Sequence, residues 1–276
     1  GYKMTTIRKP PIFTGIQMET LASDDTKVLL HQEKYIQDCV AKFGLKDCKR
    51  TDTPVNDADV NPYTITGQAL NSKETTHYRS MVGAAMWPAC LTCFQILQRV
   101  VVCSQFNQKP NSGHLDMITH VWKYLAHHAK DGIIHDSHGV TEFTIYGFGD
   151  GGLASAPHCK SVSATVHFAS TGLLGAKIRR ETSVMLASAE IELVALCDNA
   201  KQSISFRTLT NELGYTQTKP SLLLCDNKAA IAVADNEGYT ARMKHLDIKR
   251  FFIRERLASK YVRISYINTK DMLADF

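Results

Sequence analysis

The sequence predicts an α/β fold for its C-terminal half, with a mixed five-stranded sheet flanked by helices. Two observations carry this prediction. Three β-rich stretches follow one another from residue 143 with short turns between them, and helical and strand-like stretches then alternate to the end. Strands joined by hairpins pair antiparallel and strands joined by helices pair parallel, so this order predicts a mixed sheet with helices on its faces.

The elements of this half follow from local periodicity and from glycine and proline positions. Strands are expected at 143–150, 162–169 and 172–179, then a helix at 183–213, a strand at 221–226, helices at 227–235 and 245–259, a strand at 261–267 and the start of a helix at 270. Gly214 is expected to end the long helix, because glycine readily adopts the left-handed conformation that closes helices.

The N-terminal half has a mostly helical pattern. A strand-like piece is expected at 12–18, an amphipathic helix at 28–45, and helices at 78–106 and 112–128, with residues 49–74 as a Thr-, Asp-, Asn- and Pro-rich loop. Pro88 is expected to kink or break the first of the two later helices. The main boundary is expected near residue 138, and a second division is expected at the end of the loop, at residue 74. The predicted parts are therefore 1–74, 75–138 and 139–276.

Composition limits the class of protein. The 276 residues are 44% hydrophobic and carry a net charge of +5, which supports a real core and mildly favours a polyanionic partner. No apolar run approaches the roughly 18 residues of a membrane span, and no signal-peptide core begins the chain. A soluble, intracellular protein with eight reduced cysteines is therefore expected. The start without methionine suggests a piece excised from a longer polypeptide.

Four acidic residues stand where a charge is costly: Asp150, Glu192, Asp226 and Asp275. The first and third each end an expected strand, Glu192 lies inside an apolar helical stretch, and the fourth follows Leu273-Ala274. A carboxylate at the edge of a core is unfavourable unless a positive or hydrogen-bonding group receives it. Four such carboxylates from different elements predict a divalent-metal site.

The order of elements and acids resembles the ribonuclease H fold, and local segments resemble the C-terminal part of copia-type retrotransposon polyproteins. The segments that carry this resemblance are YRSMVG at 78–83, SAEIELVAL at 188–196, CDNKAAI at 225–231, KHLDIKRFFIRE at 244–255 and LAD at 273–275. Upstream, QEKYI at 32–36, FGLKDCK at 43–49 and Thr53-Pro54 are similar to the end of the same family's reverse transcriptase. The N-terminal parts would then be the end of the palm with thumb-like and connecting helices.

The resemblance implies that Asp150, Glu192, Asp226 and Asp275 are the four ribonuclease H acids and hold two Mg²⁺ ions, with Mn²⁺ as a possible substitute. It implies an endonuclease that hydrolyses the RNA strand of RNA–DNA hybrids beside the remainder of a reverse transcriptase polyprotein. The location would be the cytoplasm, within virus-like particles, or the nucleus. The polymerase aspartates normally lie upstream and are not in this sequence, so DNA synthesis by this chain alone is not expected.

Other interpretations remain open for single residues. Asp226-Asn227 could cap the following helix, Asp275 could be an ordinary first-turn acid, and Glu190 competes with Glu192. The pair Cys90 and Cys93 has metal-like spacing but no second close pair, which favours small core residues. A basic cluster suited to a phosphate backbone, or to a solvated helix end, is formed by Lys42, Lys46, Lys49 and Arg50.

Departures from the family pattern leave an alternative function open. Gly152 and Leu153 stand where the family usually has an aspartate and a tryptophan, and the region 160–187 keeps little of the expected motifs. The alternative is a catalytically inactive nucleic-acid-binding or structural remnant with the same fold. A strand-transferring enzyme is a further possibility, but that class normally uses three acids at other spacings.

Overall fold

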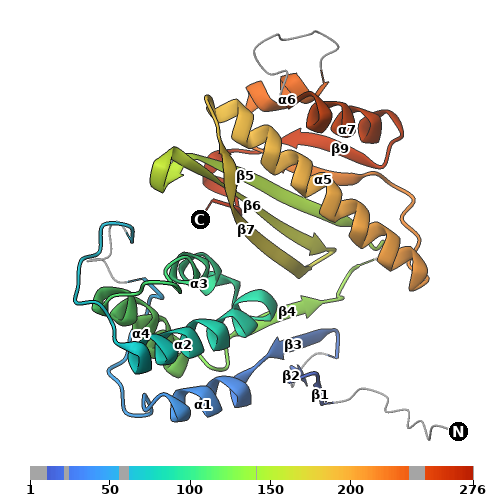
Figure 1. Ribbon diagram of the computed structural model, residues 1–276. Coiled ribbons are helices and arrows are strands. Elements are labelled where there is room, and N and C mark those ends of the chain that lie inside the picture. Colours follow the sequence, from blue (N-terminus) through green and yellow to red (C-terminus); the bar gives the residue numbers. More distant parts are fainter. Residues whose placement is uncertain (1–10, 22–24, 56–61, 141, 236–245, 276) are drawn as a thin grey trace, which may run out of the picture. The chain divides into compact units, whose positions relative to one another are not determined.

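The computed structural model describes residues 11–21, 25–55, 62–140, 142–235 and 246–275 (Figure 1). Lys244 and His245, which belong to one of the family-like segments, lie outside this part. The chain divides into two compact units, Gly1–His138 and Gly139–Phe276. Residues on both sides of position 74 contribute to the first unit, because strands from its beginning and its end share one sheet.

The first unit contains a four-stranded antiparallel sheet in the order β1-β2-β3-β4. Its strands are β1 (Ile12–Phe13), β2 (Ile16–Thr20), β3 (Lys27–His31) and β4 (Gly132–Asp136). The expected helix from residue 28 is wrong over its first turn, because Lys27–His31 forms a strand. β3 is hydrogen-bonded to β2 on one side and to β4 on the other, and these tertiary pairings override the local helical spacing.

The described residues of this unit also form the α-helices α1 (Glu33–Lys42), α2 (Ser72–Leu91), α3 (Leu97–Ser104) and α4 (Ser112–His127), with the short 3₁₀ helix η1 (Phe94–Ile96) before α3. Capping boxes at Asn71 and Asn111 begin α2 and α4. The helix expected at 78–106 is interrupted, but four residues after Pro88. The carbonyl of Pro88 accepts hydrogen bonds from the backbone N–H groups of Thr92 and Cys93 at 3.0 and 2.8 Å.

The second unit contains a five-stranded mixed sheet in the order β7-β6-β5-β8-β9. Its strands are β5 (Ile145–Ala156), β6 (Lys160–Ala169), β7 (Gly172–Val184), β8 (Ser221–Cys225) and β9 (Val262–Tyr266). β5, β6 and β7 pair antiparallel, whereas β8 pairs parallel with both β5 and β9. The predicted mixed five-stranded sheet with Asp150 on a central strand is confirmed, although that strand begins at Ile145 and not at 143.

Three helices lie on this sheet: α5 (Ser188–Glu212), α6 (Lys228–Asp235) and α7 (Asp247–Ala258) (Figure 1). A fully buried cluster that includes Ile191, Leu196, Leu223 and Ile253 joins the helices to one face. β7 runs five residues beyond its expected end, because Val184 pairs with Lys160 across the long β6–β7 hairpin. The long helix consequently begins at Ser188 and not at 183.

The expected helix from residue 270 is wrong for the described residues. A short 3₁₀ turn, η4 (Thr269–Asp271), is followed by Met272 in an extended conformation. The side chains of Met272 and Ala274 are buried with Phe148 and Val166 on the sheet face opposite α5. This burial holds the segment along the sheet, and Asp275 follows it outside any helix.

Candidate metal-binding site

The glycines of β5 bring the first turns of α5 against the strand. Successive strand residues point to opposite faces, so Gly147, Gly149 and Gly151 share the face toward α5. A Cβ atom at Gly151 would lie 2.8 Å from the carbonyl carbon of Ile191 and 3.0 Å from the backbone nitrogen of Glu192. Only glycine permits this approach of backbone to backbone, which places Glu192 at the edge of the central strand.

Strand register places Asp150 beside Asp226. β5 and β8 are parallel, and their last paired residues are Phe148 and Leu224. Asp150 and Asp226 each lie two residues further along, at the carboxyl end of this parallel pairing. β5 itself continues to Ala156, because Asp150 also pairs with Ala164 of β6. Asp150 therefore lies within the strand, which corrects the expectation that the strand ends there.

Glu192, Cys225 and Asp226 form the centre of the site. One ligand atom from each lies within 4.8 Å of the others. Glu192 is 6% exposed, and its Oε2 has no hydrogen-bond partner in the described part of the chain. Cys225, the last residue of β8, is fully buried. An orphaned buried carboxylate oxygen is unfavourable unless a cation or an acid proton satisfies it.

Asp226 is free of the capping role that the sequence left open. The side chain of Asn227 caps α6, since its Oδ1 accepts a hydrogen bond from the backbone N–H of Ala230 at 3.0 Å. Asp226 Oδ2 instead accepts a hydrogen bond from Thr269 Oγ1 at 2.7 Å. Thr269 thereby ties the segment before Asp275 to the carboxylate of Asp226.

Burial and neighbouring acids raise the pKa values of two of the four carboxyl groups, those of Glu192 and Asp150. Burial raises the pKa of Glu192 to about 8, and the charges of Asp150 and Asp226 add to the shift. Burial also raises the pKa of Asp150 to about 6, with further contributions from Asp226 and Asp275, although a hydrogen bond from the Gly151 backbone opposes it. Raised pKa values of this kind mark a place where negative charge accumulates and a cation would be stabilised.

Asp275 is the most exposed of the four. It follows the buried Ala274, and its backbone N–H donates to the carbonyl of Met272 at 3.4 Å. No α-helix in the described residues includes it, so a first-turn role is not seen. Its charge reaches the site because the buried side chains of Met272 and Ala274 hold the preceding segment on the face that Asp150 shares with Phe148.

The other candidates contribute no metal-binding group. Glu190 is engaged at the start of α5, where its Oε2 accepts a hydrogen bond from the backbone of Leu186 at 2.8 Å. Cys90 is exposed and Cys93 buried, and among the described residues only Glu192, Cys225 and Asp226 form a close group of three possible ligands. In the basic cluster, Arg50 forms an ion pair with Asp52, whose Oδ1 lies 2.8 Å from the Nε of Arg50.

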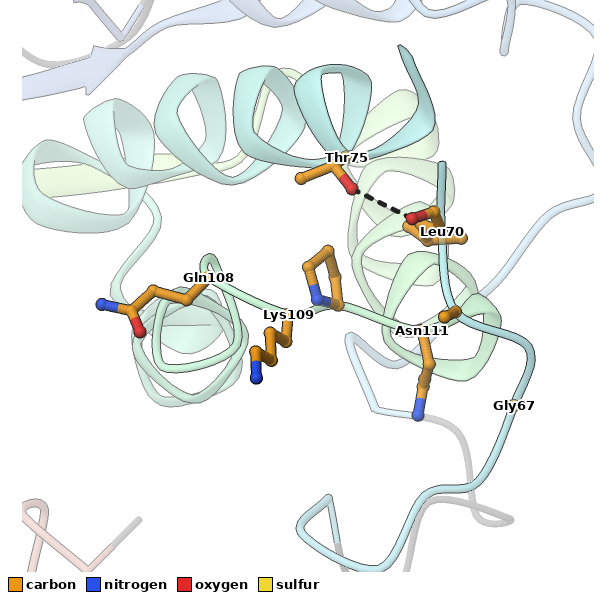
Figure 2. A pocket seen from close by; sticks show the side chains of 8 residues that line it. Gly67, Leu70, Thr75, Gln108, Lys109 and Asn111 are labelled. Carbon is orange, nitrogen blue, oxygen red and sulfur yellow. Dashed lines mark hydrogen bonds between the residues drawn. The ribbon is translucent and has the colours of Figure 1, made fainter. Parts of the chain in front are cut away.

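The first unit contains a pocket of about 280 Å³ beside the start of α2 (Figure 2). It is lined by Gly67, Ala69, Leu70, Thr75, Gln108, Lys109, Pro110 and Asn111. Thr75 donates a hydrogen bond across one wall to the carbonyl of Leu70 at 3.5 Å. The lining provides one cation and amide groups but no carboxylate, thiol or imidazole, so it offers no acid–base or metal chemistry.

Two residues of the site were missed by sequence reasoning. Cys225 was read only as part of a family-like segment, although its position next to Asp226 at a strand end was a usable signal. Thr269 belongs to none of the family-like segments. Its bond to Asp226 joins residues 43 positions apart, a contact with no local signal.

The donor set fits hard divalent cations. Mg²⁺ prefers carboxylate oxygens and water in octahedral arrangements. Asp150, Glu192, Asp226 and Asp275 supply carboxylates from a strand, a helix and two connecting segments. The role of each as a metal ligand stays a prediction.

Stability in the absence of metal is expected to depend on pH. Because Glu192 and Asp150 have raised pKa values of about 8 and about 6, these two carboxyl groups together bind more protons in the folded chain than in the unfolded chain between pH ~4 and pH ~8. Their stabilising contribution is complete at acidic pH and is lost as the pH rises through these two values. Thermal unfolding in chelator should show a midpoint that falls from pH ~5 to pH ~8.5. Glu192→Gln should flatten this slope, and an unchanged slope in that variant would contradict the assignment.

Sequence comparison finds relatives among retrotransposon polyproteins. The chain is 27% identical over 255 residues to the retrovirus-related Pol polyprotein from transposon TNT 1-94 of Nicotiana tabacum, covering 90% of this chain and 19% of the relative. It is 26% identical over 263 residues to the corresponding polyprotein from transposon RE1 of Arabidopsis thaliana, covering 95% of this chain and 17% of the relative. The chain thus spans less than a fifth of each relative. No protein-family model matches it.

Solved structures that align with this chain include a ribonuclease H domain and a reverse transcriptase. The N-terminal RNase H domain of a Mycobacterium tuberculosis protein aligns with a TM-score of 0.36 at 13% identity, covering 49% of this chain and 89% of that one. A foamy viral protease-reverse transcriptase in complex with RNA/DNA hybrid aligns with a TM-score of 0.49 at 11% identity, covering 96% of this chain and 30% of that one.

Within the described residues, no helix has the length and apolar character needed to cross a membrane.

Proposed function

We propose that this chain, which is homologous over most of its length to copia-type Pol polyproteins, is an endonuclease that cuts the RNA strand of RNA–DNA hybrids. One observation carries the proposal. Four acidic residues come from separate elements of the ribonuclease H-like unit, and burial together with neighbouring acids raises the pKa values of Asp150 and Glu192. Glu192, the most buried of the four, has a carboxylate oxygen without a hydrogen-bond partner among the described residues. Acids that only stabilised the fold would be expected to have hydrogen-bonding or basic partners.

The residues would divide the chemistry as follows. Two Mg²⁺ ions, when bound, supply an activated water and relieve charge on the leaving oxygen. Asp150, on the central strand, would hold both ions, while Glu192, Asp226 and Asp275 would complete their shells. Glu192 would give up the proton that its raised pKa retains at neutral pH, since metal binding requires the ionised carboxylate. Thr269 would orient Asp226 through its hydroxyl.

The remaining parts of the proposal concern context. The polymerase activity would be supplied by other parts of a longer polyprotein, with the first unit as thumb-like and connecting structure. The site of action would be virus-like particles in the cytoplasm or the nucleus. Basic residues such as Lys42, Lys46 and Lys49 would contact the phosphate backbone, so hybrid binding should weaken steeply with salt.

A catalytically inactive remnant is the second candidate. Its supporting observation is the replacement around Gly152 and Leu153, where Leu153 is 41% exposed and offers no polar group to a nucleic acid. The deciding experiment is a cleavage assay on labelled RNA–DNA hybrid with and without Mg²⁺ or Mn²⁺, with single-stranded RNA and duplex DNA as control substrates. Binding without cleavage at every metal concentration favours the remnant, provided that a chain extended beyond Phe276 behaves in the same way.

Thr269→Val is expected to reduce cleavage by about three- to tenfold, because it removes a hydrogen bond to a charged group at an exposed position. Valine keeps the shape of threonine, so stability should change little. Thr269→Ser keeps the hydroxyl and serves as the matched control. The effect should appear as a higher Mg²⁺ requirement in a metal titration of cleavage. Equal rates for the valine and serine variants would remove Thr269 from the site.

A further inference from the structure

We infer that Glu192, Cys225 and Asp226 form a binding site for a soft divalent cation of the Zn²⁺ and Cd²⁺ class, and that its occupation excludes Mg²⁺. The proposed binding of the soft cation depends only on these three residues. The expected inhibition of cleavage, through exclusion of Mg²⁺, rests on the proposed function.

The geometry suits a small coordination sphere. The three ligand atoms lie within 4.8 Å of one another. Zinc binds sulfur at about 2.3 Å and carboxylate oxygen at about 2.0–2.2 Å in tetrahedral sites, which places neighbouring ligands roughly 3.5 Å apart. The three atoms would therefore need to converge by up to about an ångström on binding.

The three ligand side chains would give up few existing hydrogen bonds on binding a cation. Glu192 Oε2 is buried without a hydrogen-bond partner among the described residues. The thiol of Cys225 makes a long contact of 3.9 Å with the carbonyl of Asn227. Asp226 uses Oδ2 for Thr269 and retains lone pairs on both oxygens. A bound cation would satisfy the orphaned oxygen and replace only a weak sulfur contact.

The thiol separates two classes of metal. Mg²⁺ is a hard cation that takes oxygen ligands and leaves a neutral thiol protonated. Zn²⁺ and Cd²⁺ bind thiolate strongly, so they would add the Cys225 sulfur to the two carboxylates. Binding releases the protons of Cys225 and of protonated Glu192 to the buffer as the two new metal–ligand bonds form. Because Glu192 and Asp226 would also serve Mg²⁺, the two classes of cation would compete.

A thiol in the first unit needs a control, because it also lies near a possible metal ligand. In the first unit, Cys48 Sγ lies 3.7 Å from His127 Nε2, and this pair could bind a soft metal weakly with two ligands. Cys48→Ser removes that contribution without touching the second unit. It is the matched control for Cys225→Ser, because both variants exchange one free thiol for a hydroxyl.

The test is a Cd²⁺ titration of the full chain without Mg²⁺, monitored by the ultraviolet charge-transfer absorption of the Cd–thiolate bond. The unmodified chain and Cys48→Ser should both bind Cd²⁺ in a high-affinity phase, called the tight phase, at low Cd²⁺ concentration. Cys225→Ser and Cys225→Ala should lose this phase, with the affinity for Cd²⁺ reduced by about 10- to 100-fold or more. Glu192→Gln keeps the size of the side chain and removes its ionisable carboxyl group, so it should weaken the same high-affinity binding. This variant tests the site independently of Cys225 if the cysteine variants unfold. A tight phase unchanged by the Cys225 variants and by Glu192→Gln would overturn the inference.

Competition with Mg²⁺ is measured separately. Added Mg²⁺ should raise the Cd²⁺ concentration needed for the absorption change in the unmodified chain, and a midpoint independent of Mg²⁺ would overturn the competition. Inhibition by Zn²⁺ is measured as the fraction of each variant's own cleavage rate in Mg²⁺ that remains after Zn²⁺ is added. This fraction should be larger in Cys225→Ser than in Cys48→Ser. A chain that binds Cd²⁺ through Cys225 but never cleaves hybrid would contradict the proposed function and leave the cation site standing.

Discussion

The Asp150→Asn variant is expected to lose cleavage of RNA–DNA hybrids by more than about 1000-fold while it binds hybrid as tightly as the unmodified chain. Asparagine keeps the shape of the side chain but removes the charge that would hold both cations. Metal ions stabilise the transition state by several kcal/mol, and about 4 kcal/mol corresponds to 1000-fold in rate. Binding depends on contacts to the phosphate backbone, which the substitution leaves in place.

Single-turnover cleavage and filter binding of the same labelled hybrid would measure the two quantities separately. Asp271→Asn is the matched control, since Asp271 is an exposed acid of η4 in the same unit and does not contribute to the pKa shifts of Asp150 or Glu192. A parallel loss of binding and cleavage in Asp150→Asn would indicate misfolding. Full activity in that variant would remove Asp150 from the reaction.

The Gly151→Ala variant is expected to be destabilised by about 1–3 kcal/mol and to bind Mg²⁺ more weakly. Its added Cβ would lie 2.8 Å from the carbonyl carbon of Ile191 and 3.0 Å from the nitrogen of Glu192. Both are backbone atoms of α5, so the helix as a whole must move away from β5. That movement carries Glu192 away from Asp226 and separates their carboxylates.

Denaturant unfolding and Mg²⁺ titration would test this expectation, with Gly152→Ala as the control. A Cβ at Gly152 would meet chiefly the side chain of Ser155, whose Oγ would lie at 2.8 Å and can rotate away. A Cβ at Gly151 would therefore meet the backbone of α5, whereas a Cβ at Gly152 would meet a small side chain. Equal stability losses in both variants would show that close packing of α5 on β5 does not position Glu192.

Much of the second unit was predictable because its signals are local. The β-rich stretches that form β5 and β6, the short apolar run of β8 and the helical spacing after Ser188 are local patterns, so element type and order could be read directly. The errors there lie at element ends, at Val184 and after residue 270, where long-range pairing and burial decide the limits. In the first unit, β3 was read as a helix because its partner β4 lies over 100 residues away.

The sequence by itself determined the α/β order of the second unit and the four acids worth considering, because charges inside apolar stretches are unusual wherever they occur. Only the tertiary structure decided how those acids meet. The β5–β8 register sets Asp150 beside Asp226, Gly151 admits the backbone of α5, and burial of Met272 holds the last segment on the sheet. The same packing brought Cys225 and Thr269 to the site. Such placements depend on close contacts between elements distant in the chain, and these leave no periodic trace along it.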